Sequence, residues 1–375
     1  MNTNPIDPAL VAAVREFIEA CVCARPSTEA EAMGFQRKLS PEPESPRAHP
    51  NDDPGDFDAL CLEIAAAQDA LDDDPAAGLA AIRPIPETGF KLMTLAHFPP
   101  SEAQATFRTS GTTTGTSGRH LIRDLDLYRL SGVAGFRRFV MPDGVPMRFV
   151  HLIPPGSSRP QSSLSRMVDD VVAAFGTSPA VCARTGDAVD LAVAMQAFEA
   201  AAGTGQPLCV LGTSLDCLTL FDGMRTRGAA LALPAGSRVM HTGGDKATGR
   251  SITREALRAE LEALLGVPPD LVIEEYGMTE LLSQAYDAPR VTPGPRRLVP
   301  VPWMRTRVLD PATMDEVPDG ERGILCHYDL ANVYTAVAVL TNDTATRVQD
   351  GFTDIVRVPG AVARGCSSEA ATRTL

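Results

Sequence analysis

The sequence is poor in basic residues and contains no Lys/Arg-rich block. Its 375 residues include 34 Lys and Arg against 47 Asp and Glu, which gives a formal net charge of −13 and a pI near 5.0. A chain of this charge is repelled by phosphate backbones and by anionic lipid headgroups. The composition therefore argues against nucleic acid or an anionic membrane surface as the main partner.

Targeting and membrane signals are also lacking. The first residues, Met1–Pro8, carry no basic region, and no apolar stretch approaches the roughly 20 residues that a membrane helix needs. We therefore expect a cytoplasmic protein without a membrane span and without a nucleic-acid partner.

Paired Cys-x-x-Cys spacing, which is typical of a zinc site, is missing too. Eight cysteines are scattered at positions 21, 23, 61, 182, 209, 217, 326 and 366. In a reducing compartment most such cysteines are small buried hydrophobic residues. We interpret all of them as structural except Cys366, which is discussed below.

The first part of the chain divides into three stretches. Residues 8–24 have helical spacing of apolar residues, and residues 57–71 have it again. Between them, residues from about 25 to 56 are rich in Pro, Glu, Ser and Asp and have few apolar anchors. This composition predicts an exposed, partly disordered segment.

From residue 147 apolar strand patterns alternate with amphipathic helix patterns. Strands are predicted at 148–153, 208–211, 237–241 and from 271, and helices from Ser162 or Ser163 to Phe175 and from Ile252 to Leu265. Such alternation predicts an α/β fold with a mostly parallel sheet covered on both faces. After residue 300 the pattern changes to short strands at 305–309, 323–328, 335–341 and 352–357, which predicts a β-rich C-terminal part.

Within the stretch Phe107–His120, Ser and Thr are combined with three glycines, after which comes a cation, Arg119. Glycines let backbone N–H groups approach a polyphosphate, and hydroxyls add hydrogen-bond donors. The stretch therefore indicates a phosphate-binding loop. Because Ser/Thr/Gly clusters are also ordinary surface linkers, the linker interpretation stays open on this segment alone.

Three further segments follow the loop in a specific order: Thr242-Gly-Gly-Asp-Lys246, Tyr276-Gly-Met-Thr-Glu280 and Leu340-Thr-Asn-Asp343. The set resembles the adenylate-forming superfamily. Within it, the chain is most similar to the acyl-protein synthetases of bacterial bioluminescence, the long-chain-fatty-acid–luciferin-component ligases. The resemblance covers roughly residues 85 to 370 and is also carried by Ile122–Asp124, His151–Pro155, Ser162–Met167 and Arg364–Ser367.

The resemblance implies a fold like the N-terminal domain of an adenylate-forming enzyme, with ATP and Mg²⁺ as cofactors. It divides the chain into a helical region at 1–84, an adenylate-forming core at 85–345 and a short tail at 346–375. Adenylate-forming ligases usually carry a further C-terminal domain of about a hundred residues, and here only 32 residues follow Asp343. We therefore expect the full C-terminal lid domain to be lacking.

The resemblance also implies roles for individual residues. The β- and γ-phosphates would be held by Thr109, Ser110, Gly111, Thr112 and Thr113. The loop departs from the superfamily pattern because Gly115 falls one place late and no Pro-Lys follows, so Arg119 is the candidate for the missing cation. The adenine or acyl group would lie against Gly243 and Gly244, whose alternative role is a tight turn.

The remaining assignments come from the later segments. Tyr276, with Gly277, would stack on adenine, or else pack at a strand end. Thr279 would donate to the α-phosphate, and Glu280 would help to hold Mg²⁺. Asp343 would accept hydrogen bonds from the ribose hydroxyls unless it is a surface-turn carboxylate. Arg357 stands near the ribose position, although Val356 replaces the usual Gly before it.

Cys366 decides the reaction type, because acyl-protein synthetases pass the acyl group from acyl-AMP to a cysteine near their C-terminus. A thiolate readily attacks a mixed anhydride with AMP, although an incidental tail thiol is the alternative. The chain is thus expected to be an ATP-dependent acyl-protein ligase acting on a fatty or related carboxylic acid, with an acyl reductase or a carrier protein as partner. Two alternatives remain: a truncated aryl- or acyl-adenylating enzyme of secondary metabolism, of the phenazine-tailoring kind, and a non-catalytic acyl-adenylate-binding protein.

Overall fold

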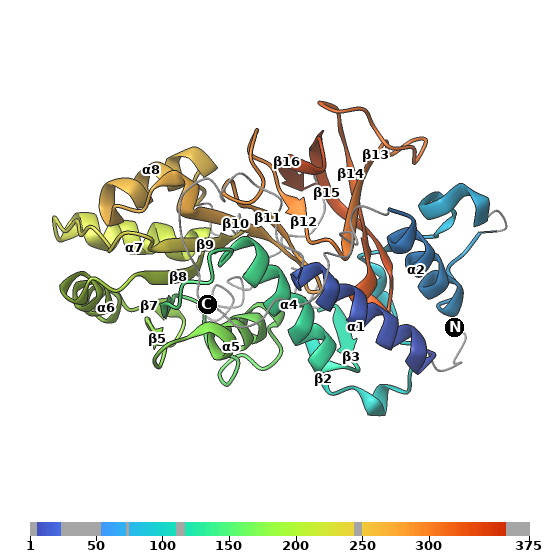
Figure 1. Ribbon diagram of the computed structural model, residues 1–375, viewed down its shortest axis with the longest axis horizontal. Coiled ribbons are helices and arrows are strands. Elements are labelled where there is room, and N and C mark those ends of the chain that lie inside the picture. The colour runs from blue at the N-terminus through green and yellow to red at the C-terminus, as the bar shows by residue number, and fades with distance from the viewer. Residues whose placement is uncertain (1–5, 24–53, 73–74, 110–116, 244–249, 358–375) are drawn as a thin grey trace, which may run out of the picture.

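A computed structural model describes residues 6–23, 54–72, 75–109, 117–243 and 250–357 (Figure 1). Most of the segment predicted to be disordered, residues 25–56, lies outside this description. So do loop residues Ser110, Gly111, Thr112 and Thr113, as well as Gly244 and Cys366.

A seven-stranded sheet forms one half of the molecule (Figure 1). Its five strands β5, β4, β8, β9 and β10 run parallel, and β11 and β12 extend it in the antiparallel sense. In order across the sheet, the strands are β12 (Val299–Pro300), β11 (Ala285–Asp287), β10 (Val272–Tyr276), β9 (Arg238–Thr242), β8 (Leu208–Thr213), β4 (Arg148–His151) and β5 (Val181–Cys182). The predicted parallel sheet is confirmed.

Helices cover both faces of this sheet, as the alternating pattern predicted. One face packs on α6 (Leu191–Thr204), α7 (Ser214–Thr226) and α8 (Arg254–Leu265), and the other on α4 (Leu125–Phe139) and α5 (Ser163–Phe175). Their ends follow the expected capping chemistry. Ser162 Oγ accepts from the N–H of Ser165 at the start of α5, and Gly266 ends α8 in the left-handed conformation at φ 64°.

A second sheet of five strands forms the β-rich part. It consists of β1 (Ile85–Pro86), β13 (Met304–Leu309), β14 (Arg322–Asp329), β15 (Ala338–Val348) and β16 (Gly351–Arg357), with β15 paired to β1, β14 and β16. The strand predicted at 335–341 is wrong in its bounds, because β15 begins at Ala338 and continues to Val348. Pairing with β14 and β16 on either side keeps the polar run Thr341–Thr344 extended.

Shorter elements complete the chain. The hairpin β2 (Ala105–Arg108) and β3 (Arg119–Ile122) flanks the loop at 109–118, and β6 (Arg184–Thr185) pairs with β7 (Ala188–Val189). The remaining helices are α1 (Pro8–Cys23), α2 (Pro54–Ala67), α3 (Gly89–Leu92), η3 (Pro75–Ala81), η4 (Pro100–Glu102), η6 (Pro269–Leu271) and η7 (Leu330–Asn332). Both long N-terminal helices predicted from spacing are present, although α2 ends at Ala67 rather than at residue 71. None of the described helices has the length and apolarity to cross a membrane.

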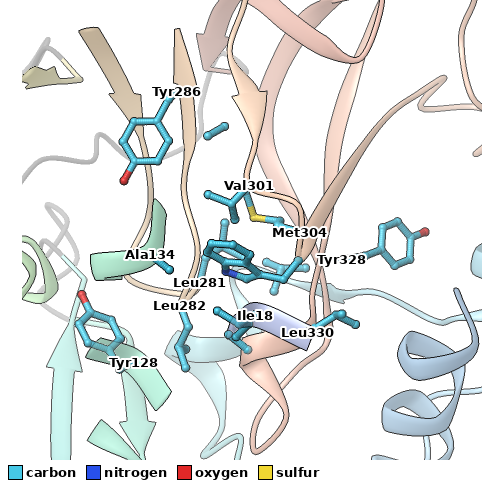
Figure 2. Packing of buried hydrophobic residues seen from close by; sticks show 14 of the residues in the cluster. Ile18, Tyr128, Ala134, Leu281, Leu282, Tyr286, Val301, Met304, Tyr328 and Leu330 are labelled. Carbon is cyan, nitrogen blue, oxygen red and sulfur yellow. The ribbon is translucent and has the colours of Figure 1, made fainter. Parts of the chain in front are cut away.

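One hydrophobic cluster joins the two sheets to the N-terminal helices. Figure 2 shows Ile18 of α1 close to Leu281 and Leu282, which follow β10, and to Leu330 of η7. Trp303, the single tryptophan of the chain, is fully buried in this cluster. Thus α1 and α2 are packed into the same core as the sheets.

The indole N–H of Trp303 begins a buried hydrogen-bonded chain. Nε1 donates to Ser131 Oγ at 2.8 Å, Ser131 Oγ lies 3.0 Å from Ser283 Oγ, and Ser283 Oγ donates to Asp329 Oδ1 at 2.5 Å. Asp329 also accepts from the N–H groups of Leu282 and Ser283 at 2.8 and 3.0 Å. The chain therefore fixes the residues directly after Glu280 against β14.

Ser131→Ala is expected to lower the free energy of unfolding by about 1–3 kcal/mol, because it leaves the buried indole N–H of Trp303 without an acceptor. Urea unfolding followed by the emission of this single tryptophan measures the change. Ser158→Ala is the matched control, since Ser158 is exposed and only caps a turn at Pro155, and it should change stability by less than about 0.5 kcal/mol. Equal effects of the two variants would contradict the buried network.

Candidate active site

The candidate site lies where the two sheets meet, at the carboxyl end of β10. Tyr276 ends this strand, and its hydroxyl donates to Asp343 Oδ2 at 3.0 Å. Asp343 stands inside β15 and is 6 % exposed. The surface-turn alternative for Asp343 is therefore excluded, and two motifs separated by 67 residues are in direct contact.

Arg357 connects Asp343 to a third carboxylate. It is paired with Asp343 across β15 and β16, and its Nη1 donates to Asp343 Oδ1 at 3.1 Å. Its Nη2 donates to Glu87 Oε1 at 2.6 Å. Glu87 is 1 % exposed and also accepts from Asn342, from the backbone N–H at 3.2 Å and from Nδ2 at 2.9 Å. Arg357 is thus held between two carboxylates.

Glu87→Gln is expected to lower the free energy of unfolding by about 2–3 kcal/mol, because the buried partner of Arg357 loses its charge and presents an amide N–H₂ to donors. Chemical denaturation measures the change. The control is Glu102→Gln, which removes the half-exposed ion pair with Arg123 at 2.8 Å and should cost less than about 1 kcal/mol. A Glu87 variant no less stable than this control would contradict the network.

The ring of Tyr276 is packed by two aromatic side chains. Phe352 meets it edge to face at a centroid distance of 5.5 Å, and His327 lies tilted at 5.5 Å. Burial raises the pKa of the Tyr276 hydroxyl, which is therefore protonated and donates to Asp343. This strand-end packing fixes where one edge of the ring lies.

The backbone after Tyr276 is held by two polar side chains. His120 Nδ1 donates to the carbonyl oxygen of Thr279 at 2.7 Å, and Asn332 Nδ2 donates to the carbonyl oxygen of Glu280 at 3.0 Å. Burial lowers the pKa of His120 to about 4, so this histidine is neutral at pH 7. His120 thereby ties strand β3, which leaves the loop, to the Tyr276–Glu280 segment.

Glu280 is a buried carboxyl group in a charged environment. It is 2 % exposed, and its pKa is raised to about 7, mainly by burial, with a further contribution from Asp343. Hydrogen bonding to its own backbone and the charges of Lys91 and Arg357 act in the opposite direction. A cation next to Glu280 would stabilise its charged form.

The donor set around Glu280 is compatible with Mg²⁺. Among the described residues there is no group of three or more His, Cys, Asp or Glu side chains that could hold a metal ion. Mg²⁺ bound to a nucleotide uses one or two carboxylates together with phosphate oxygens and water. A single carboxylate at Glu280 fits that arrangement, in which the metal would polarise the phosphates.

Thr279 faces the start of helix α5. Its Oγ1 lies 3.5 Å from Ser163 Oγ, in the first turn of the helix. The N–H groups and the positive end of a helix dipole favour an anion at such a position. Thr279 thus lies beside the N-terminus of α5, which is a source of positive electrostatic potential.

The glycines predicted to line the site differ in their surroundings. A Cβ on Gly277 would lie 2.4 Å from Glu275 Oε1 and 3.3 Å from Gln284 Cγ, so a side chain there would displace the Glu275 carboxyl group. A Cβ on Gly243 would meet no atom of the described residues within 4 Å. Gly277 is therefore closely packed, whereas the described residues leave space around Gly243.

The base of the predicted phosphate loop is closed by Thr109 and Gly118. The N–H of Thr109 donates to the carbonyl oxygen of Gly118 at 3.0 Å, and the N–H of Gly118 donates to Thr109 Oγ1 at 2.8 Å. The Thr109 hydroxyl therefore serves the hairpin. Arg119 is exposed, and its Nη2 donates to Thr94 Oγ1 at 3.3 Å.

The structure thus joins Tyr276, Asp343 and Arg357 directly, and it places Thr279 and Glu280 on the same segment. It does not bring Arg119 into contact with that group. Sequence reasoning assigned no role to Glu87, His120, Asn332 or Lys91. Each of them is a single polar residue outside a periodic pattern, so no sequence signal marked it.

Residues 67–367 match the family described as LuxE, acyl-protein synthetase. The chain belongs to the acyl-protein synthetase family. This match covers most of the chain and confirms the resemblance drawn from the motifs. No curated protein matches the chain.

Solved structures of adenylate-forming ligases are similar at low identity. ATP-bound MatB from Rhodopseudomonas palustris aligns with 68% of this chain over 48% of its own length, at 17% identity and a TM-score of 0.48. An open conformation of 2-hydroxyisobutyryl-CoA ligase in complex with 2-HIB-AMP and CoA aligns with 97% of this chain over 76% of its own length, at 17% identity and a TM-score of 0.49. The amide bond synthetase McbA from Marinactinospora thermotolerans aligns with 69% of this chain over 49% of its own length, at 16% identity and a TM-score of 0.46. The chain therefore spans about half the length of MatB and McbA.

Proposed function

We propose that this acyl-protein synthetase activates a carboxylic acid with ATP as acyl-AMP and transfers the acyl group to a thiol, that of Cys366. The observation that carries the proposal is the contact of Tyr276 with Asp343 at 3.0 Å, backed by Arg357. Three separate motifs meet at this point, next to Glu280. This arrangement supports a nucleotide site between the two sheets.

The proposed roles follow the geometry. Asp343 accepts hydrogen bonds from the ribose hydroxyls, and Arg357 on the neighbouring strand fixes the orientation of the Asp343 carboxylate. Tyr276 and Gly277 receive the adenine, Thr279 donates to the α-phosphate, and Glu280 holds Mg²⁺, which neutralises phosphate charge. The loop residues from Thr109 to Thr113 lie along the β- and γ-phosphates, and Gly243 and Gly244 lie beside the adenine or the acyl group.

Adenylation is then a displacement at the α-phosphorus of ATP. One carboxylate oxygen of the acid forms the new P–O bond, and the bond to the bridging oxygen of pyrophosphate breaks. Negative charge grows on the α-phosphoryl oxygens, where donors such as Thr279 act most strongly. Acyl-AMP stays bound and pyrophosphate leaves.

The second step forms a thioester. The Cys366 sulfur, after losing its proton to solvent, attacks the acyl carbon, and the C–O bond to AMP breaks. The described cysteines support this choice, because burial raises the pKa of Cys21, Cys209, Cys217 and Cys326 to about 12 and that of Cys61 still further. Such thiols are poor nucleophiles at neutral pH. An acyl reductase or a carrier protein would receive the group next.

Acid-dependent ATP–pyrophosphate exchange tests the proposal. A panel of fatty, aromatic and short carboxylic acids is offered with MgATP and labelled pyrophosphate. At least one acid is expected to give exchange above the acid-free rate, and the preferred acid identifies the substrate class. Nucleotide binding by calorimetry without exchange for any acid would instead favour a non-catalytic acyl-adenylate-binding protein.

A further inference from the structure

The charge balance of the site is unfavourable for a polyphosphate. Glu87 and Asp343 are carboxylates that share Arg357, and the carboxyl of Glu280 is electrostatically coupled to Asp343. Arg357, the guanidinium among them, is already bonded to Glu87 and Asp343. Because a nucleotide adds further negative charge, a second cation is needed where the phosphates lie.

Lys91 is the candidate for this cation. Its side chain lies against the base of the loop, because a Cβ on Gly118 would be 3.1 Å from Lys91 Cγ and 2.9 Å from Thr109 Oγ1. Gly118 therefore leaves the space through which the aliphatic stem of Lys91 passes. The stem contacts the point where both ends of the loop meet.

The backbone of Lys91 is firmly placed. It belongs to α3, whose Phe90 is buried and meets His120 at a ring-centroid distance of 5.2 Å. The N–H of Lys91 donates to the carbonyl oxygen of Thr88 at 3.0 Å. Since His120 also holds Thr279, one strand positions both the helix that carries Lys91 and the segment that carries Glu280.

The ammonium group of Lys91 is electrostatically coupled to the site. It forms no hydrogen bond or ion pair with any residue that the structure describes. Partial burial lowers its pKa, the carboxyl of Glu280 acts to raise it, and Arg357 acts to lower it. The electrostatic partners of Lys91 are thus the charged residues of the site.

Arg119 is the less suitable cation. Successive side chains of a strand point to opposite faces, and His120 on β3 faces the Thr279 segment. Arg119 therefore faces away from that segment, toward Thr94. A compact ammonium and a planar guanidinium also bind phosphate differently.

We propose that Lys91 is the phosphate-binding cation of this active site, where it stabilises the negative charge on the ATP phosphates during adenylation. The proposal rests on the function proposed above. It assigns to α3 the lysine that the loop between β2 and β3 does not supply. Arg119 then has no direct part in the chemistry.

Substitutions at Lys91 test the proposal. Lys91→Ala is expected to lower the rate of ATP–pyrophosphate exchange at saturating acid about 100-fold and to leave the KM for the acid unchanged. Lys91→Arg should keep about a tenth of the wild-type rate, since it restores charge without the same geometry. Leu92→Ala, on the same helix and with Leu92 81 % exposed, is the matched control and should behave as wild type.

A chemical footprint provides a second readout. The chain has only three lysines, at 38, 91 and 246, so acetylation of each is resolved by peptide mass spectrometry, with Lys38 as internal reference. MgATP at about ten times its Kd should slow acetylation of Lys91 about tenfold. Inorganic pyrophosphate should protect it as well.

The outcomes separate this inference from the proposed function. If the wild type exchanges and Lys91→Ala retains its rate within about twofold, Lys91 is not the cation and the proposed function stands. If no acid supports exchange by the wild type, the proposed function fails, and the footprint alone decides about Lys91. If Lys91 is acetylated as fast with MgATP bound as without it, the proposal is overturned.

Discussion

Glu280→Gln is expected to reduce ATP–pyrophosphate exchange by about 100-fold or more while the protein remains folded. The neutral amide keeps the shape of the side chain but cannot hold Mg²⁺ against the phosphates. The carboxyl of Glu280 is buried, and its pKa is raised to about 7 mainly for that reason. Burial disfavours the charged form of this carboxyl group, so the neutral amide should leave the variant about as stable as the wild type.

This combination of lost activity and retained stability distinguishes a functional carboxylate from a structural one. Glu274→Gln is the matched comparison, because Glu274 lies on β10 and is bonded to Arg254 at 2.5 Å. Loss of this ion pair should lower the free energy of unfolding and leave ATP–pyrophosphate exchange largely intact. Denaturation and exchange are measured on both variants. Undiminished exchange in Glu280→Gln would remove Glu280 from the site.

Cys366→Ser is expected to abolish labelling of the protein by radioactive acid and ATP, while pyrophosphate exchange persists. In the proposed mechanism, adenylation uses Thr279, Glu280 and Asp343 but no thiol. Thioester formation needs a sulfur nucleophile, because a serine hydroxyl is protonated at neutral pH and far less nucleophilic without a neighbouring base. The two half-reactions are therefore separable at this residue.

The labelling experiment compares wild type, Cys366→Ser and Cys182→Ser. Cys182 is the control because it is partly exposed, whereas Cys21, Cys61, Cys209, Cys217 and Cys326 are buried. Wild type and control should carry hydroxylamine-sensitive label, and Cys366→Ser should carry none. Labelling of the Cys366 variant, or failure of the wild type to label with an acid that it adenylates, would favour transfer to an external acceptor.

The fold could be predicted well where a short stretch determines its own structure. The cap at Ser162 and the left-handed Gly266 are local features, and the apolar strands between helices indicated a parallel sheet. The extent of β15 could not be predicted, because Asn342 and Asp343 in its polar run have low intrinsic strand preference. They are extended because two neighbouring strands supply their hydrogen bonds.

The candidate site could be predicted in part. The motif order indicated Tyr276, Glu280 and Asp343, and the contact between Tyr276 and Asp343 agrees with that expectation. Glu87 and Lys91 reach the site from the turn directly after β1 and from the single helical turn α3, neither of which has a periodic pattern. Only the tertiary packing of β1 on β15 and of α3 on β3 reveals what they contact.

Following the carboxylate oxygen of the acid tests its activation as acyl-AMP most directly. The wild-type enzyme is given MgATP and the preferred acid labelled with ¹⁸O in both carboxylate oxygens, and the products are analysed by mass spectrometry. If acyl-AMP forms and is cleaved by a thiol, each AMP released carries one ¹⁸O in its phosphate. Unlabelled AMP, or ADP with ¹⁸O in inorganic phosphate, would contradict activation of the acid as acyl-AMP.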